Sequence, residues 1–219
     1  MQKIRLTLII LLFAVWISGC SAIAKFGTQP PISANSGAIL FSEDFSSDEN
    51  GWTTWNQNGS MAGYQIEGFR FFVGEANFDF LSHPGYNFGD VRVDVDAIKI
   101  SGPNNNAFGV ICRMVDEENF YAFLISSDGY AGILRVLDGR YTLLNNDSME
   151  YAEAIYQGEA LNKMSALCQG NQLSLMVNGS SLLSVVDDSF ATGDVGLMAG
   201  AYDEADVDVM FDNLLVSQP

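Results

Sequence analysis

Short segments of alternating apolar and polar residues, divided by tight-turn dipeptides, occupy the chain from residue 38 onward. Apolar side chains recur at every second position in residues 91–97, 172–177 and 206–211. Successive side chains of a β-strand point to opposite faces, so this period predicts strands buried on one face. The intervening dipeptides include Asp128-Gly129, Asp138-Gly139, Gly170-Asn171 and Asn178-Gly179. Such pairs supply the positive φ angles of hairpin turns, and many strands at this spacing predict a sandwich or a barrel.

Two further segments, residues 108–115 and 120–126, are apolar on both faces. That pattern is expected of central strands that are covered on each side. The best helical candidate, residues 149–160, contains a glycine and is only weakly amphipathic. The prediction is therefore an all-β domain.

Four longer segments carry a resemblance to a known superfamily. They are EDFSSDENGW (43–52), FGVICRMVDEENFYAFLISSDGYAGI (108–133), LCQGNQLSLMVNG (167–179) and GDVGLMAGAYDEADVDVMFDN (193–213). Residues 41–217 resemble bacterial extracytoplasmic domains of the concanavalin A-like lectin/glucanase superfamily, and are most similar to the 3-keto-disaccharide hydrolase family. The resemblance implies an antiparallel jelly-roll sandwich of two sheets, whose concave face often holds sugars.

The first twenty residues have the layout of a secretory signal: Lys3 and Arg5, then the apolar residues 6–17, then small residues before Cys20. Twelve apolar residues are too few to span a bilayer, which needs about 20. Ile-Ser-Gly-Cys resembles the lipobox of bacterial lipoproteins, in which the cysteine thiol receives a diacylglycerol. The alternative is a plain signal peptide with an incidental cysteine.

The lipoprotein interpretation divides the chain into three parts. We expect a signal peptide at 1–19, a lipidated Cys20 followed by a flexible tether to residue 37, and a β-sandwich domain at 38–219. The protein would then be exported and lipid-anchored to the cell membrane or outer membrane, on the extracytoplasmic side.

The two remaining cysteines, Cys112 and Cys168, are a candidate disulfide, because an exported domain matures in an oxidising compartment. The alternative is two separate buried thiols.

The charge of the chain limits its partners. Removal of Lys3 and Arg5 with the signal takes the net charge from −17 to −19. Such a surface repels phosphates, so a nucleic-acid partner is excluded and the lipid must hold the protein at the membrane. A solvated acidic surface is one interpretation, and binding of Ca²⁺ or of neutral, hydroxyl-rich ligands is the other.

Catalytic motifs are weak. Glucanases of the resembled superfamily carry a Glu-x-Asp-x-x-Glu strand, whereas this chain has Asp206, Asp208 and Asp212 at a different spacing. We interpret these three as solvent-facing positions of a closing strand, and Asp94 and Asp96 in the same way. A single histidine, His83, and few free cysteines leave too few ligands for a zinc enzyme.

A structural calcium ion needs only oxygen ligands. The first strand, with Glu43 and Asp44, and the last, with Asp212 and Asn213, are expected to lie close in a closed sandwich. Some sugar-binding sandwiches hold Ca²⁺ at such a place. The alternative is that these side chains accept backbone hydrogen bonds at strand ends.

Two tryptophans are candidates for stacking on a sugar, because Trp52 and Trp55 flank polar residues in an expected loop. The alternative is that each covers the core.

A second candidate for ligand binding is a row of Arg113, Tyr121 and Arg135. Arg113 lies across from Tyr121 if residues 115–119 connect their strands, and Arg135 joins the row if residues 127–129 form the next turn. A two-residue Asp-Gly turn would instead put Arg135 on the other face. The row would clamp ligand oxygens, or its arginines would pair with the chain's own carboxylates.

These observations favour a non-catalytic, surface-tethered module that binds carbohydrate or another envelope ligand. A structural lipoprotein predicts instead a flat, filled concave face. A glycoside hydrolase predicts two carboxylates about 5–10 Å apart in the groove, one with a raised pKa.

Overall fold

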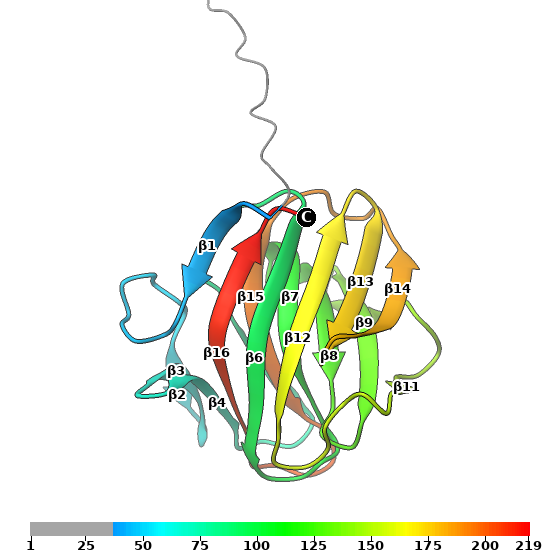
Figure 1. Cartoon of the computed structure of the whole chain (residues 1–219). Coiled ribbons are helices and arrows are strands. Elements are labelled where there is room, and N and C mark those ends of the chain that lie inside the picture. The colour runs from blue at the N-terminus through cyan, green and yellow to red at the C-terminus, as the bar shows by residue number, and fades with distance from the viewer. Residues whose placement is uncertain (1–36) are drawn as a thin grey trace, which may run out of the picture. The chain divides into compact units, whose positions relative to one another are not determined.

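The computed structural model describes residues 37–219, and all of its regular elements in this range are strands. Two sheets, here called sheet A and sheet B, lie face to face, with sheet A in front in Figure 1. Every strand pair is antiparallel. The prediction of an all-β domain with two antiparallel sheets is confirmed. The described range contains no helix of the length and apolarity that a membrane crossing requires.

Sheet A has nine strands. They follow the order β14-β13-β12-β6-β16-β4-β3-β2, and β1 pairs with the C-terminal part of β16. The strands are β1 (Ile39–Glu43), β2 (Trp55–Gln57), β3 (Ser60–Gln65), β4 (Gly68–Val73), β6 (Val91–Ser101), β12 (Leu161–Gln169), β13 (Gln172–Val177), β14 (Ser180–Val186) and β16 (Val207–Ser217). The first and last strands are therefore neighbours, as expected from the sequence.

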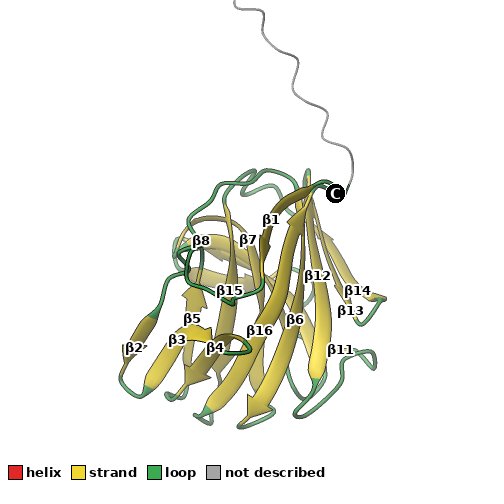
Figure 2. Ribbon diagram, turned by 60° about the vertical axis from the view of Figure 1, so that its left-hand side comes forward, coloured by secondary structure: helices red, strands yellow, loops and turns green. Residues whose placement is uncertain are grey.

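Sheet B has seven strands. They follow the order β10-β9-β8-β7-β15-β5, and β11 pairs with β9. The strands are β5 (Phe78–Ser82), β7 (Asn106–Asp116), β8 (Asn119–Ile125), β9 (Tyr130–Leu137), β10 (Arg140–Leu143), β11 (Glu150–Tyr151) and β15 (Asp194–Ala201). Strands β10 and β5 thus end the sheet at opposite edges. Figure 2 shows the strands of both sheets after a turn of 60°.

The main core fills the space between the sheets. Residues at alternate positions of β6 and β13 are buried in it, as the period of two predicts, and they pack against aromatic rings from both sheets. The fully buried rings include Phe69, Phe71, Phe108, Phe123 and Phe211. Burial of such apolar surface is the main favourable contribution to folding.

A second apolar cluster lies on the outer face of sheet B. Its members are Ala107, Ile111, Met114, Phe120, Ala122, Leu124, Val136 and Met198. Strands β7 and β8 are consequently buried on both faces over most of their length, which is what their continuous apolar sequence predicts.

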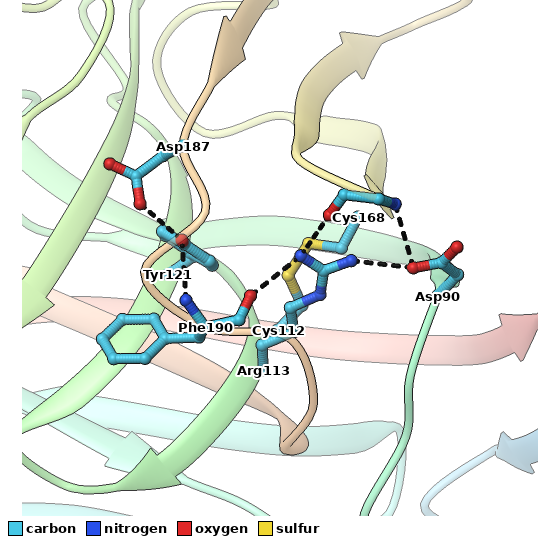
Figure 3. The surroundings of a disulfide bond; sticks show 8 residues. Asp90, Cys112, Arg113, Tyr121, Cys168, Asp187 and Phe190 are labelled. Atoms are coloured by element: carbon cyan, nitrogen blue, oxygen red, sulfur yellow. Dashed lines mark hydrogen bonds and ion pairs between the residues drawn. A yellow bond between two sulfur atoms is a disulfide. The ribbon is translucent and has the colours of Figure 1, made fainter.

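A disulfide between Cys112 of β7 and Cys168 of β12 joins the two sheets (Figure 3). The Cα atoms are 6.9 Å apart, and both side chains are fully buried in the main core. The bond therefore crosses the layer that the two sheets enclose. The signal and most of the tether, including Cys20, lie outside the described residues.

A candidate binding groove on the outer face of sheet B

The two edge strands of sheet B approach each other across its outer face. Asp79 lies on β5 and Tyr141 on β10, with four strands between them. On a flat sheet, strands about 4.8 Å apart would separate these residues by about 24 Å. Instead both side chains line the same two pockets, and each is close enough to alter the pKa of the other. Sheet B is therefore strongly curved, and its outer face forms a groove.

One pocket of this groove encloses about 300 Å³. Its floor is apolar and its rim carries polar and aromatic side chains. The lining residues are Asn77, Phe78, Asp79, Ala107, Leu124, Leu134, Tyr141, Met198, Gly200, Ala201 and Tyr202. Gly200 pairs with Asp79, and a Cβ atom at Gly200 would lie 3.0 Å from the Cβ of Asp79. Because glycine has no side chain, position 200 leaves space in the pocket next to the carboxylate of Asp79.

A second pocket of about 380 Å³ continues the groove and shares Phe78, Asp79, Tyr141 and Met198 with the first. It adds the side chains of Thr53, Trp55, Gln57 and Glu117. A third pocket, of about 370 Å³, shares Glu117 and reaches His83 and Asp194. We call these three connected pockets the sheet B groove.

Aromatic rings line one side of the sheet B groove. Trp55 stacks on Phe80 with ring centroids 4.0 Å apart and planes inclined by 29°, and Phe80 in turn lies 5.0 Å from Phe78. One face of the Trp55 ring is thus used by Phe80. Trp55 keeps its place as a candidate sugar-stacking residue, since it also lines the groove.

Three ionisable groups that line the first pocket have shifted pKa values. Burial raises the pKa of the Asp79 carboxyl, and the hydroxyl of Tyr141 partly offsets this. Burial, together with the charge of Asp79, raises the pKa of Tyr141. Burial also raises the pKa of Tyr202. The two tyrosines are therefore neutral hydrogen-bond donors at neutral pH, which is suited to the hydroxyl groups of a ligand.

Sequence reasoning missed Asp79, Tyr141 and Tyr202. One signal was available, because Asp79 is a lone carboxylate between Phe78 and Phe80 in a short strand. The partners that complete the groove come from distant strands, so no local pattern joins them.

Trp52 is not a sugar-stacking residue, which corrects one of the two tryptophan predictions. Its side chain is 3% exposed, and it packs against Phe45 and Phe69 with ring centroids 5.3 and 5.8 Å away. A ring enclosed on both sides has no face left for a ligand. The alternative interpretation, a cover for the core, describes Trp52 correctly.

Arg113 is not part of a ligand clamp, which corrects the prediction for the arginine row. Arg113 is 1% exposed and donates hydrogen bonds to the carbonyls of Gly170 and Phe190 and to Asp90 (Figure 3). The distances are 2.7, 3.0 and 2.8 Å. Arg113 therefore fixes loops of this chain, and no part of its guanidinium reaches a ligand from outside.

Tyr121 and Arg135 face each other, as predicted, but both bind the loop that follows β14. The hydroxyl of Tyr121 donates to Asp187 at 2.6 Å, and Arg135 donates to the other oxygen of Asp187 at 2.7 Å. The expected pairing of Arg113 with Tyr121 is wrong, because Cys112 occupies that position and a bulge follows it. The arginines pair with carboxylates, which was the alternative.

The acidic residues of β16 and β6 lie on the outer face of sheet A. Asp208 is buried, contrary to the expectation that it faces solvent. Its side chain is 5% exposed and accepts two hydrogen bonds from Arg70, of 2.7 and 2.6 Å.

The other aspartates of this group have local partners. Asp94 pairs with Arg92, and Asp96 pairs with Lys163. Asp212 accepts hydrogen bonds from Asn213, its neighbour in the chain. Asp206 has a positive φ of 68° before β16. None of these residues lines the sheet B groove.

The proposed calcium ligands accept hydrogen bonds within their own turn. Glu43 accepts from the Phe45 backbone at 2.6 Å and from Asn50 at 2.8 Å, while Asp44 accepts from the backbone and hydroxyl of Ser46. Strand β1 pairs with β16, so Glu43 lies opposite Leu214. Residues 37–219 contain no group of three or more acidic, His or Cys side chains placed to hold a metal. A calcium ion at Glu43, Asp44 and Asp212 stays a prediction.

Comparisons with known proteins give the fold. No protein-family model matches the chain, and no curated protein matches its sequence. Among solved structures, the carbohydrate-binding module CBM66 from Bacillus subtilis has a TM-score of 0.62 at 16% identity, over 77% of this chain and 96% of that one. A galectin-like protein of unknown function from Bacillus subtilis has a TM-score of 0.60 at 13% identity, over 84% and 97%.

A longer protein also contains a similar domain. The GH43 protein BlXynB from Bacillus licheniformis has a TM-score of 0.60 at 13% identity, and the match covers 81% of this chain but 39% of that chain. At these identities the comparisons establish the fold alone, a jelly-roll sandwich, as predicted, and transfer no residue roles.

Proposed function

We propose that this chain is an exported, lipid-anchored protein whose β-sandwich binds carbohydrate in the sheet B groove. The observation that carries the proposal is the composition of that groove. An apolar floor, the aromatic side chains of Tyr141, Trp55 and Tyr202, and a few polar groups together line one concave surface. Sugars present both apolar ring faces and hydroxyl groups, so a site for them needs both kinds of lining. The similarity to the module CBM66 supports this proposal.

A purely structural role predicts a flat, filled concave face. The sheet B groove is neither, because its connected pockets enclose hundreds of Å³ and its small floor residues, Ala107 and Gly200, leave space above the sheet. This difference favours ligand binding over a structural role.

One observation favours a second candidate function, glycoside hydrolysis. Asp79 and Glu117 line the same pocket, and the pKa of Asp79 is raised by burial. Most glycosidases use two carboxyl groups, one protonated and one ionised. Asp79 would be the acid and Glu117 the base or nucleophile.

The binding proposal is tested with a glycan array on the purified full-length protein held in mild detergent. We expect binding to at least one oligosaccharide, and loss of that binding in Tyr141→Ala and Trp55→Ala. Tyr156→Ala is the matched control, because Tyr156 is an exposed tyrosine that lines none of the three groove pockets. Absence of binding to every glycan, by a folded protein, would overturn the proposal.

A glycan that binds in the array is then used to test for hydrolysis. It is incubated with the protein, and the new reducing ends are measured. Ends that form with the wild type and not with Glu117→Gln would establish hydrolysis. No new ends, with binding retained, would leave a binding module.

The location rests on the N-terminal sequence. Mass spectrometry of the N-terminal peptide from membrane fractions is expected to find cleavage before Cys20 and a diacylglycerol on its thiol. An intact N-terminus in a cytosolic pool would overturn the location without affecting the groove.

A further inference from the structure

The charged groups of the sheet B groove are all acidic apart from His83. Asp79, Asp116, Glu117 and Asp194 line its pockets, and no lysine or arginine of residues 37–219 does so. Asp194 is bound by His83 and by two backbone N–H groups, and Asp116 by groups in its own turn. Asp79 and Glu117 have no ion-pair partner among the described residues. These two carboxylates face one shared pocket.

The outer face of sheet A is arranged differently. There Asp208, Asp94 and Asp96 each have a basic partner within 3 Å. Two further arginines, Arg113 and Arg135, are used by the loops around the disulfide. The chain has few lysines and arginines, and the five in residues 37–219 that form ion pairs line none of the groove pockets. Asp79 and Glu117 therefore have no basic side chain as a partner among the described residues and are open to a cationic ligand.

We propose that the sheet B groove selects a sugar chain that carries free amino groups, a class that includes oligomers of glucosamine. This inference rests on the proposed carbohydrate-binding function and names its ligand class. A protonated amine between Asp79 and Glu117 would supply the missing counter-charge. Charge-assisted hydrogen bonds of this kind are roughly twice as strong as neutral ones.

The aromatic lining fits the same ligand. Tyr141 and Trp55 both line the pocket that holds the two carboxylates. Aromatic ring faces attract cations, and they also stack on the apolar faces of sugar rings. A cationic sugar would use both properties, while an anionic sugar would be repelled by the carboxylates of Asp79 and Glu117.

Burial supports the assignment to Asp79 in particular. Its carboxyl lies beside the apolar floor, and this burial raises its pKa. A charge held in such surroundings is costly without a partner, so a cation gains more from Asp79 than from an exposed carboxylate.

The test compares three tetrasaccharides that share β-1,4 linkages and differ at the C2 substituent. The probes are glucosamine tetramer, N-acetylglucosamine tetramer and cellotetraose, titrated calorimetrically into the full-length protein at about pH 6, where the amino groups are protonated. We expect glucosamine tetramer to bind about tenfold more tightly than either neutral probe. Its advantage should fall as salt rises from about 0.05 to 0.5 M, because salt screens the charges.

Two variants test whether Asp79 and Glu117 cause the preference for the glucosamine tetramer. Asp79→Asn and Glu117→Gln are each expected to weaken binding of the glucosamine tetramer more than binding of the neutral tetramers, so that its advantage is lost. Glu118→Gln is the matched control, because Glu118 is the adjacent acidic residue and lines none of the three pockets. Circular dichroism and thermal unfolding of each variant confirm that it is folded.

The outcomes separate this inference from the proposed function. Equal or tighter binding of cellotetraose or N-acetylglucosamine tetramer would overturn the amino-sugar preference and leave carbohydrate binding intact. A preference that survives in both Asp79→Asn and Glu117→Gln would overturn its assignment to these residues. If no glycan of the array binds to the folded protein, the proposed function itself fails.

Discussion

Cys112 of sheet B and Cys168 of sheet A form a disulfide across the main core, 56 residues apart in the chain. Closing a loop of this length restricts the unfolded chain, which in the loop-entropy model stabilises the fold by about 4 kcal/mol at most. We expect the double variant Cys112→Ala/Cys168→Ala to lose up to that free energy of unfolding in urea titrations.

The control for this prediction is the wild-type protein after reduction, which should lose a similar amount. Thiol titration of the unfolded, unreduced protein should find neither cysteine reactive. Two reactive thiols in protein isolated from an oxidising compartment would contradict the pairing.

The two neighbouring tryptophans should respond to substitution in opposite ways. Trp52 is buried against Phe45 and Phe69, so Trp52→Ala should lower the free energy of unfolding by about 3–5 kcal/mol. Trp55 lines the sheet B groove, so Trp55→Phe should weaken glycan binding with a smaller loss of stability. Urea unfolding and calorimetric titration measure the two effects. A binding defect in Trp52→Phe, with full stability, would return Trp52 to the binding site.

The ion pair of Arg70 and Asp208 should matter for stability alone. Asp208 is buried on the outer face of sheet A and accepts both hydrogen bonds of a bidentate pair. Asp208→Asn loses two charge-assisted hydrogen bonds and leaves the guanidinium of Arg70, whose side chain is 35% exposed, without its partner, so we expect a cost of about 2 kcal/mol. A double-mutant cycle with Arg70→Gln measures the coupling. Glycan binding should stay unchanged, and any selective loss of a hydrolytic activity in Asp208→Asn would restore the catalytic interpretation of this strand.

Local sequence patterns predicted the strands but not how residues on different strands are paired. The alternation in β6 needs only the period of two, so its buried face was evident from sequence. The position opposite Tyr121 was predicted correctly for Arg135 and incorrectly for Arg113. Arg113 has a φ of 51° and lies in the irregularity between Cys112 and Asp116, where three residues of β7 oppose one residue of β8. Such a bulge shifts the pairing of every position beyond it.

The sheet B groove depends on curvature, which is a property of the whole sheet. Asp79 and Tyr141 lie in strands at opposite edges, and nothing near either residue in the sequence indicates that they meet. The jelly-roll resemblance placed a ligand on the concave face, yet it did not identify the lining residues. The tryptophans stood out in the sequence because of their type, and burial then decided between them: Trp55 lines the groove, and Trp52 does not.

The last prediction concerns His83, whose Nδ1 lies 2.8 Å from a carboxylate oxygen of Asp194. The same oxygen accepts a hydrogen bond of 2.6 Å from the backbone of Gly85. The hydrogen bond with Asp194 raises the pKa of His83 above its ordinary value of about 6.5, against the opposing effect of burial. The charged imidazolium is therefore favoured in the folded protein.

A histidine with a raised pKa stabilises the fold most when it is protonated in both states, which is below its pKa in the unfolded chain. That contribution is lost as the pH rises through the folded-state pKa. The difference in unfolding free energy between wild type and His83→Gln should thus be largest below about pH 6 and shrink towards about pH 8. Urea titrations across this range measure it, with Tyr86→Phe as a neighbouring control that should show no such trend. A difference that stays constant or grows with pH would show that His83 is not held as the imidazolium by Asp194.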